Sequence, residues 1–412
     1  MEIDADFHVH SPFSGGVSEK MEIPVIAEQA ETKGLDLIGT GDILHPEWRR
    51  KVEKQTEERE EGIFSHGDTK FILTTEVEDK NRVHHVIIFP GPSSVEQLYS
   101  QLSNFSSDID KEGRPRVELD GEKIAEEAKK VDALIGPSHA FTPWTSIYKE
   151  HGSLESCYGE LDIDFLELGL SADTELADKI SEHNSLTFLS NSDSHSPWPH
   201  RIGREFNRIE VDKLSFKEIK KAIKQNKIKL NVGFNPREGK YHCSACQECY
   251  QKYSLAQARR NDWKCVECGG TVKKGVKDRI KELSDGGKSP NWRPEYMHLV
   301  PLAEIIKQVV GHSSVTTKKV QRIYDRYVEK FDSETDILVD EPAKKLKKVN
   351  QKVGAAVEKF REGKTVMVPG GGGEYGELII PRNEEERRRI VEERESELNC
   401  EYRGNQKSLG EF

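Results

Sequence analysis

The stretch IDADFHVHS, residues 3–11, decides how the rest of the chain is interpreted. If it forms a strand, side chains two positions apart point to the same face, so His8 and His10 direct two imidazoles at one spot. Such a pair suits a first-row metal ion. Asp193 and His195 repeat this spacing in TFLSNSDSH, residues 187–195. The two pairs predict that the first and last strands of a barrel are neighbours and bind metal together.

Between these pairs, short apolar runs alternate with helix-patterned segments up to about residue 230. The runs include LDLIGTGD (35–42), FILTTEVE (71–78), VHHVIIF (83–89), ALIGPSH (133–139) and DFLELGL (164–170). This alternation predicts an α/β fold with mostly parallel strands, and in an α/β barrel the C-terminal strand ends hold the reactive groups. The ligands predicted at these ends are His8, His10, Asp42, Glu76, His84, His139, Asp193 and His195.

Two of these ligand assignments have competitors. His84 and His85 are adjacent, so only one of them can face the pocket, and His45 follows Asp42 on the next loop. Within the set, Glu76 can bridge two ions with its two oxygens. Asp193 is expected to bind metal and to help orient the nucleophile. The predicted catalytic residues are Asp193, Glu76 and His139.

The cysteines form a second pattern. Cys246, Cys249, Cys265 and Cys268 follow C-x2-C-x15-C-x2-C, which is the spacing of a zinc ribbon with one structural zinc ion. Cys243 also makes a C-x2-C with Cys246, so it is an alternative ligand. Cys157 and Cys400 stand alone, and we expect both to be free thiols.

The charge of the chain is unevenly distributed. The 412 residues carry a net charge of −11, yet residues 212–288 contain 19 Lys or Arg against nine Asp or Glu. An acidic body with one basic segment can present a face for nucleic-acid phosphates. The candidate phosphate-binding residues are His200, Arg201 and Arg204 beyond the last metal pair, and Arg259, Arg260, Lys273 and Lys274 in the cysteine-rich segment.

Domain boundaries follow from these shifts in composition. We expect a barrel over residues 1–235, the basic zinc ribbon over 236–290, a mainly helical domain over 291–400 and a tail over 401–412.

No apolar run approaches the roughly 20 residues that span a bilayer, and the N-terminus lacks the apolar core of a signal peptide. The expectation is a soluble cytoplasmic protein without a membrane partner.

The motifs DFHVHS, GTGD, TTEVE, VHHVII, GPSHAFTPW and NSDSH resemble the polymerase and histidinol phosphatase (PHP) domain over the first 230 residues. The resemblance implies a distorted (β/α)7 barrel that hydrolyses phosphoesters with two or three divalent metal ions, zinc foremost, with manganese, iron or magnesium as alternatives. It also places Val83-His84 in register with the family's motif. Asp42 falls where most members have a histidine, and Ser14 lies near a further histidine of many members.

The full arrangement of barrel, ribbon, RPEYMHLVPLAEII (293–306) and PGGGGEYGE (369–377) resembles the archaeal endonuclease Q family. The resemblance implies nicking of DNA on the 5′ side of deaminated bases (uracil, hypoxanthine, xanthine) and abasic sites. The glycine run departs from the family's usual Pro-Gly-Tyr-Asp-Gly form. Residues expected to line a pocket for the damaged base are Ser138, Phe141, Gly169, Leu170 and Ser171.

The tail carries a separate motif. Gln406, Leu409 and Phe412 in QKSLGEF resemble the peptide by which repair and replication proteins bind the sliding clamp.

Two other interpretations of the whole chain compete with a DNA-repair nuclease. One is a histidinol-phosphatase-like enzyme acting on a small phosphate ester. The other is a non-catalytic zinc-ribbon protein that binds nucleic acid.

Overall fold

The protein is described here by a computed structural model that covers residues 1–402. Strand β1 (Glu2–Asp6) lies inside its main sheet, parallel to β2 (Leu37–Gly39) and antiparallel to β11 (Phe206–Glu210). The strand order of this sheet is β15-β12-β11-β1-β2-β5-β4-β3. Its other strands are β3 (Glu57–Glu60), β4 (Ile63–His66), β5 (Thr69–Ile72), β12 (Ile228–Gly233) and β15 (Glu295–His298).

Two smaller sheets extend the α/β body. One holds β6 (Thr74–Glu78), β7 (His84–Ile88) and β8 (Leu134–Pro137), which pair antiparallel, and the other pairs β9 (Phe165–Glu167) with β10 (Thr187–Leu189) in parallel. The predicted α/β class is confirmed, but the strand pairing mixes both directions and is divided among three sheets. The connection 79–83 between β6 and β7 explains part of the difference, because a connection this short joins only antiparallel strands.

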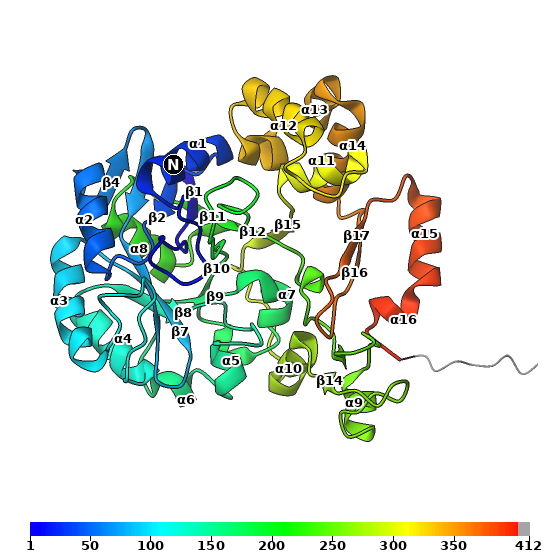
Figure 1. Ribbon diagram of the computed structural model, residues 1–412, viewed down its shortest axis with the longest axis horizontal. Helices are drawn as coiled ribbons and strands as arrows, with labels where there is room; N and C mark the ends of the chain where they lie inside the picture. Colours follow the sequence, from blue (N-terminus) through cyan, green and yellow to red (C-terminus); the bar gives the residue numbers. More distant parts are fainter. Residues whose placement is uncertain (403–412) are drawn as a thin grey trace, which may run out of the picture.

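Helices cover the outside of this body (Figure 1). Helix α4 shows why: Asp120 caps its first turn by accepting a hydrogen bond from Lys123 N, and one face buries Ile124, Ala125 and Ala128. The helices and 3-10 turns of the body are α1 (Ile23–Lys33), α2 (Pro46–Gln55), α3 (Pro92–Leu102), η1 (Ser103–Phe105), α4 (Gly121–Lys130), α5 (Ile147–Glu150), α6 (Glu155–Tyr158), η2 (Gly169–Ser171), α7 (Thr174–Ala177), η3 (Ser181–His183) and α8 (Phe216–Lys224).

The cysteine-rich segment forms a small unit beside the body. It comprises η4 (Pro236–Glu238), the two-stranded β13 (Ala245–Cys246) and β14 (Val272–Lys273), α9 (Leu255–Arg260) and α10 (Val276–Leu283). The glycine run packs directly on it. Gly372 has a φ of +68°, and a Cβ at this position would lie 2.2 Å from the carbonyl oxygen of Cys246. Only glycine therefore allows the loop to approach the ribbon so closely.

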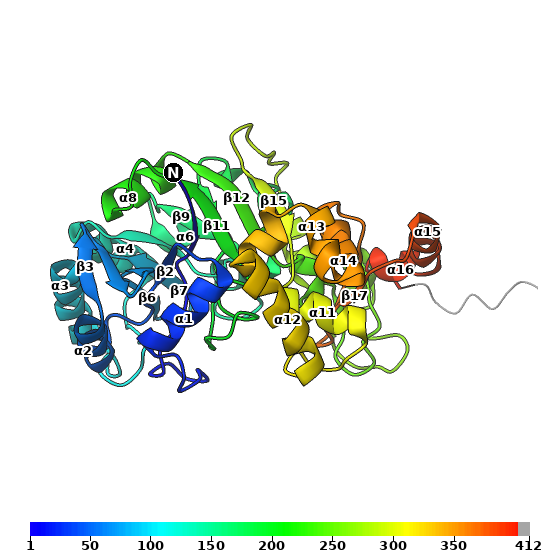
Figure 2. The same cartoon turned by 90° about the horizontal axis from the view of Figure 1, so that it is seen from above.

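The remaining residues form a helical unit and a C-terminal hairpin (Figures 1 and 2). Strand β15 pairs with β12, so residues 295–298 belong to the sheet of the body although they were expected to begin the helical domain. The hairpin is also an addition to the expected helices. The elements are α11 (Leu302–Val310), α12 (Lys318–Phe331), the π-helix η5 (Asp336–Asp340), α13 (Ala343–Val349), α14 (Gln351–Arg361), β16 (Val366–Val368), β17 (Glu377–Ile379), α15 (Glu384–Glu393) and α16 (Glu395–Leu398).

A buried ion pair joins the helical unit to the body. Lys33 Nζ at the end of α1 lies 2.8 Å from Glu334 Oε1 and donates to the carbonyl oxygen of Pro199 at 3.1 Å. Glu334 also accepts hydrogen bonds from Leu302 N and the hydroxyl of Tyr324. The contact therefore ties three segments that are distant in sequence.

None of the helices within residues 1–402 has the length and apolar character needed to cross a membrane.

Candidate metal centre

The segments that follow β1 and β10 run side by side at one end of the body. Val9 and Ser194 form a parallel bridge, and His10 N donates to the carbonyl oxygen of Ser194 at 3.0 Å. The His10 ring consequently lies edge-on to His195, with 4.9 Å between ring centroids. The two i, i+2 pairs of the sequence thus converge, as their spacing predicts for neighbouring strands.

Glu76 on β6 lies at the middle of this convergence. Its Oε1 lies 3.5 Å from Nε2 of His8, 3.2 Å from Nδ1 of His84 and 3.2 Å from Nε2 of His139. The other oxygen, Oε2, lies 3.6 Å from Nε2 of His10. Glu76 is buried. One carboxylate therefore faces four imidazoles.

Asp193 extends the cluster toward solvent. Its Oδ1 lies 3.1 Å from Nε2 of His10 and 3.5 Å from Nε2 of His195. The side chains of Asp193 and His195 are 29% and 38% exposed, whereas those of Glu76 and His10 are buried. A substrate can therefore reach the cluster from the side of Asp193 and His195.

Backbone strain marks the same residues. Asp193 has a φ of +45° and His139 a φ of +30°, in the left-handed region that non-glycine residues rarely adopt. Asp42 shares this feature, with a φ of +48°. Such strain persists only where the surrounding structure imposes it, and it is concentrated at functional sites.

The donor atoms fit divalent cations. His8 Nε2 and Glu76 Oε1 are buried and have no hydrogen-bond partner among the described residues. Three overlapping groups have their donor atoms within 4.8 Å of one another: His8, His10 and Glu76; His10, Asp193 and His195; Glu76, His84 and His139. Buried polar atoms without partners are costly, and nitrogen and carboxylate oxygen are the donors that zinc and manganese accept. The residues present therefore match a centre for more than one ion.

The protonation of the centre also favours cation binding. Burial alone would raise the pKa of Glu76, but the nearby imidazoles of His84 and His8 hold that pKa well below its usual range. The pKa of Asp193 is lowered in the same way, against the effect of burial, by His10 and His195. Both carboxylates are therefore ionised at neutral pH.

Asp42, predicted as a ligand, is not brought into these groups. Its Oδ1 lies 3.0 Å from Nδ1 of His10, and its Oδ2 accepts from Ser11 N, the Ser11 hydroxyl and the Ser14 hydroxyl at 2.6–2.8 Å. With its oxygens so occupied, Asp42 orients the His10 ring from behind. Ser14 contributes to the site by holding Asp42.

The competing histidines lie elsewhere. His84 points toward Glu76, whereas His85 on the opposite face lies 2.7 Å from the Tyr158 hydroxyl. His45 caps α2 by accepting from Trp48 N, and its ring stacks on Phe13.

Two residues at the centre were not singled out from the sequence. Glu167 at the end of β9 has both oxygens 3.0 Å from Nδ1 of His8, and it accepts from His139 N at 3.0 Å. Arg114 Nη1 lies 3.2 Å from Oε2 of Glu76. An acid inside the apolar run DFLEL, residues 164–168, is a usable signal for Glu167. Arg114 lies in an irregular loop and offers no such signal.

The residues predicted to bind phosphate are partly engaged within the protein. Arg204 Nε donates to the carbonyl oxygen of Ser192 at 2.9 Å, which places this guanidinium directly behind the Asp193 loop. Arg259 and Lys274 both contact Glu282. Arg201 and Arg260 are exposed, and His200 and Lys273 are partly exposed.

The residues predicted to line a base pocket surround the strand ends. A Cβ at Gly169 would lie 2.6 Å from Cβ of His139, so the 169–171 turn touches the metal centre. Ser138 is buried, and Phe141 stacks on Tyr148 with 5.0 Å between ring centroids. Leu170 and Ser171 are partly buried.

The four predicted ribbon cysteines meet in one group. The Sγ atoms of Cys246, Cys249, Cys265 and Cys268 lie within 4.8 Å of one another. The Tyr253 hydroxyl donates to Cys265 Sγ at 3.1 Å. Although burial opposes it, hydrogen bonds from Tyr253 and the neighbouring backbone lower the pKa of Cys265 to about 6. The convergence of four Sγ atoms fits a structural zinc site.

Cys243 and Cys400 form a disulfide that links the ribbon to the end of α16. The expectation of a free Cys400 is therefore wrong, because residues 157 positions apart are brought together only by the fold. Cys243 is thereby removed from the alternatives for the zinc site. Cys157 is a free, buried thiol.

The tail motif of Gln406, Leu409 and Phe412 lies outside the described residues.

Comparisons with known sequences give matches of different extent. The family model described as MJ0043 C-terminal domain matches residues 301–364. Protein MJ0043 of Methanocaldococcus jannaschii is 48% identical over 246 residues, which are 58% of this chain and only 31% of that protein. Protein YqxK of Bacillus subtilis is 30% identical over 402 residues, covering 92% of this chain and 99% of YqxK.

Two solved structures match nearly the full length. The lesion-specific endonuclease PfuEndoQ of Pyrococcus furiosus is 51% identical with a TM-score of 0.91, covering 93% of this chain and 96% of that chain. A structure of endonuclease Q with a 27-mer duplex that holds an abasic lesion at the active site is 50% identical with a TM-score of 0.88. This second match covers 93% and 97% of the two chains.

Proposed function

The chain belongs to the endonuclease Q family, and from that premise we propose that it nicks DNA beside damaged nucleotides by metal-assisted hydrolysis. The proposed substrates are DNA strands with an abasic site or a deaminated base (uracil, hypoxanthine or xanthine), cut on the 5′ side. The observation that carries the proposal is the convergence of five imidazoles around two carboxylates, those of Glu76 and Asp193. A small-molecule phosphatase would not need the basic ribbon, and a passive binding protein would not need this buried donor set.

The residues proposed to hold two or three divalent ions are His8, His10, Glu76, His84, His139, Asp193 and His195. When bound, such ions neutralise phosphate charge and make water a better nucleophile at neutral pH. Asp193 is ionised and partly exposed, so it can accept a hydrogen bond from the attacking water and hold that water in line. Asp42 and Glu167 keep the rings of His10 and His8 in place.

Damaged nucleotides suit a recessed site. Turning a nucleotide out of a duplex costs a few kcal/mol, and the cost is least where pairing is already poor or absent. The turn 169–171, in contact with His139, is proposed to face the displaced nucleotide. We further propose that the tail motif of Gln406, Leu409 and Phe412 binds a sliding clamp, which would deliver the enzyme to DNA.

Labelled duplexes test the proposal directly. Each carries one uracil, hypoxanthine or abasic site and is incubated with wild type, with Asp193→Ala and with chelator-treated protein. We expect a single nick 5′ of the lesion with the wild type alone and its return when metal is restored. Intact duplexes together with rapid phosphate release from a small ester would instead identify a phosphatase.

A further inference from the structure

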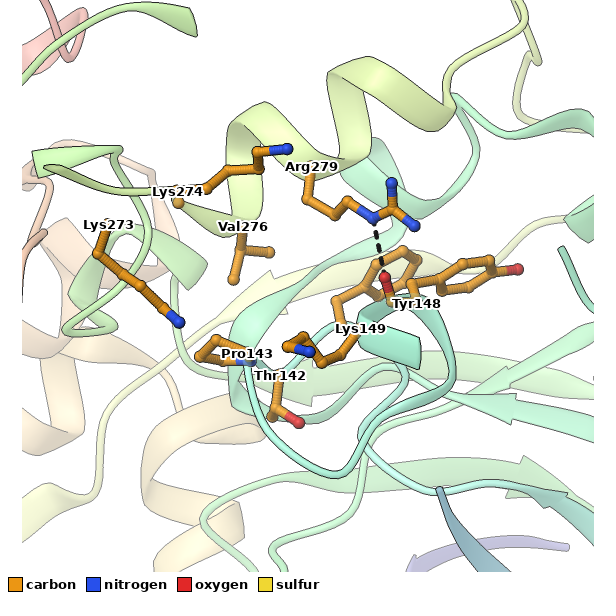
Figure 3. Close-up of a pocket in the computed structure, with 10 residues that line it drawn as sticks. Thr142, Pro143, Tyr148, Lys149, Lys273, Lys274, Val276 and Arg279 are labelled. Carbon is orange, nitrogen blue, oxygen red and sulfur yellow. Dashed lines mark hydrogen bonds between the residues drawn. The ribbon is translucent and has the colours of Figure 1, made fainter. Parts of the chain in front are cut away.

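A cationic cavity lies next to the metal centre, between the α/β body and the ribbon. It has a volume of about 340 Å³ and lies between loop 141–149 of the body and residues 273–279 of the ribbon unit (Figure 3). Thr142 joins it to the centre, because its hydroxyl oxygen lies 3.1 Å from Nδ1 of His139. The side chain of Thr142 therefore contacts both a group held in the cavity and His139 of the metal centre.

Every ionisable lining side chain other than a tyrosine is a cation: Lys149, Lys273, Lys274 and Arg279. Arg279 and Lys274 are already used to build the wall. Arg279 Nε donates to the carbonyl oxygen of Tyr148 at 2.8 Å, as Figure 3 shows, and Lys274 contacts Glu282 at 2.8 Å. The cavity thus has a rigid cationic side and two further lysines.

Those two lysines are the ones available to a ligand. Lys273 Nζ lies 4.6 Å from the centre of the Trp144 ring, and no carboxylate of the described residues forms an ion pair with it. Among residues 1–402, the Lys149 ammonium forms an ion pair only with Glu150, its exposed neighbour, at 3.2 Å. An exposed pair of this kind contributes little and exchanges readily for a stronger anion.

The aromatic side chains complete the chemistry. Phe141 and Tyr148 line the cavity but are buried and stack on each other, so the exposed ring is that of Trp144, which is 53% exposed and lies beside the cavity under Lys273. Cations next to an exposed aromatic face suit a single nucleic-acid strand, since amines bind phosphates and rings stack on sugars or bases. A small phosphate would use the lysines but not the Trp144 ring.

We propose that this cavity binds the sugar-phosphate of the cleaved DNA strand next to the scissile bond, through Lys149 and Lys273. The inference rests on the proposed function and assigns part of its substrate path. It explains why the ribbon, which holds no metal-centre residue, is fixed against loop 141–149. Its role is to close the second wall of the strand path.

The test compares Lys149→Ala/Lys273→Ala with the matched double variant Lys344→Ala/Lys348→Ala, whose exposed lysines both lie on α13. Binding to a duplex with one abasic-site analogue is measured by fluorescence anisotropy over a range of salt concentrations, in full-length protein carrying Asp193→Asn to prevent cleavage. We expect about tenfold weaker binding and a loss of one to two units in the slope of log Kd against log salt. Lys149→Arg/Lys273→Arg should restore both.

Further readouts separate the outcomes. With Asp193 intact, nicking of the abasic duplex should fall in the cavity variant and stay at the wild-type rate in the Lys344→Ala/Lys348→Ala control. A cavity variant that binds DNA like the Lys344/Lys348 control overturns the proposal. Wild-type protein that neither binds nor cuts damaged DNA would instead reject the proposed function.

Discussion

Both carboxylate oxygens of Glu167 lie 3.0 Å from Nδ1 of His8, at a site hidden from solvent. Glu167 also accepts from His139 N and from the side-chain amide of Asn191. This carboxylate therefore fixes the ring of one candidate ligand and the backbone of another. It does so from a strand that contributes no ligand itself.

Replacement of Glu167 by glutamine should weaken metal binding by about 10- to 100-fold, since partners of this kind set the orientation and basicity of ligand imidazoles. Metal retained after dialysis against a competing chelator is the measurement. Glu160→Gln, at an exposed position, is the matched control. A Glu167→Gln protein that retains metal like the wild type would show that His8 is held by other contacts.

The buried pair of Lys33 and Glu334 should be essential for stability. Glu334→Gln leaves an uncompensated ammonium in the interior, so the free energy of unfolding should fall by about 3 kcal/mol. Lys33→Met/Glu334→Leu should recover much of this loss. Urea unfolding measures both, with Lys51→Met, from the half-exposed pair with Glu22, as the control expected to cost under about 1 kcal/mol. Equal costs for Glu334→Gln and Lys51→Met would contradict the prediction.

Stability should also decrease in mild acid through His183. Burial lowers the pKa of His183 to about 4, with the nearby charge of Arg293 acting in the same direction. The unfolded chain has its histidines near 6.5, so between pH 6.5 and 4 it binds a proton that the folded chain excludes. Above pH 6.5 the His183 side chain costs no stability. As the pH falls from 6.5 to 4, the free energy of unfolding should decrease by about 3 kcal/mol because of His183.

His183→Gln tests this assignment, because glutamine keeps a donor and an acceptor but does not titrate. The difference in unfolding free energy between wild type and His183→Gln should change with pH only between 6.5 and 4. A difference that is constant over this range would exclude His183 as the source.

The ribbon site should hold one metal ion independently of the metal centre in the α/β body. Cys268→Ser should lose one equivalent of zinc, because three thiolates hold the ion more weakly than four. Asp193→Asn should leave that equivalent in place. Elemental analysis of dialysed protein distinguishes the two, and equal zinc content in wild type and Cys268→Ser would argue against a ribbon metal.

Asp42 shows where sequence reasoning reached its limit. Its position in GTGD correctly places it at a strand end near His10, yet only the contacts with Ser11 and Ser14 show that its oxygens are occupied. Cys400 shows the same limit at long range. Its pairing with Cys243 depends on how the C-terminal helices return to the ribbon.

The α/β class, the convergence of the paired ligands and the grouping of four cysteines could be predicted from the sequence, because these depend on side-chain periodicity and short spacing. The fold was needed to show which acids face the centre and which stand behind a ring, where the sheets separate, and how the lysines are arranged around the cavity. Those properties depend on distances between segments far apart in the chain, and packing of the whole molecule sets such distances.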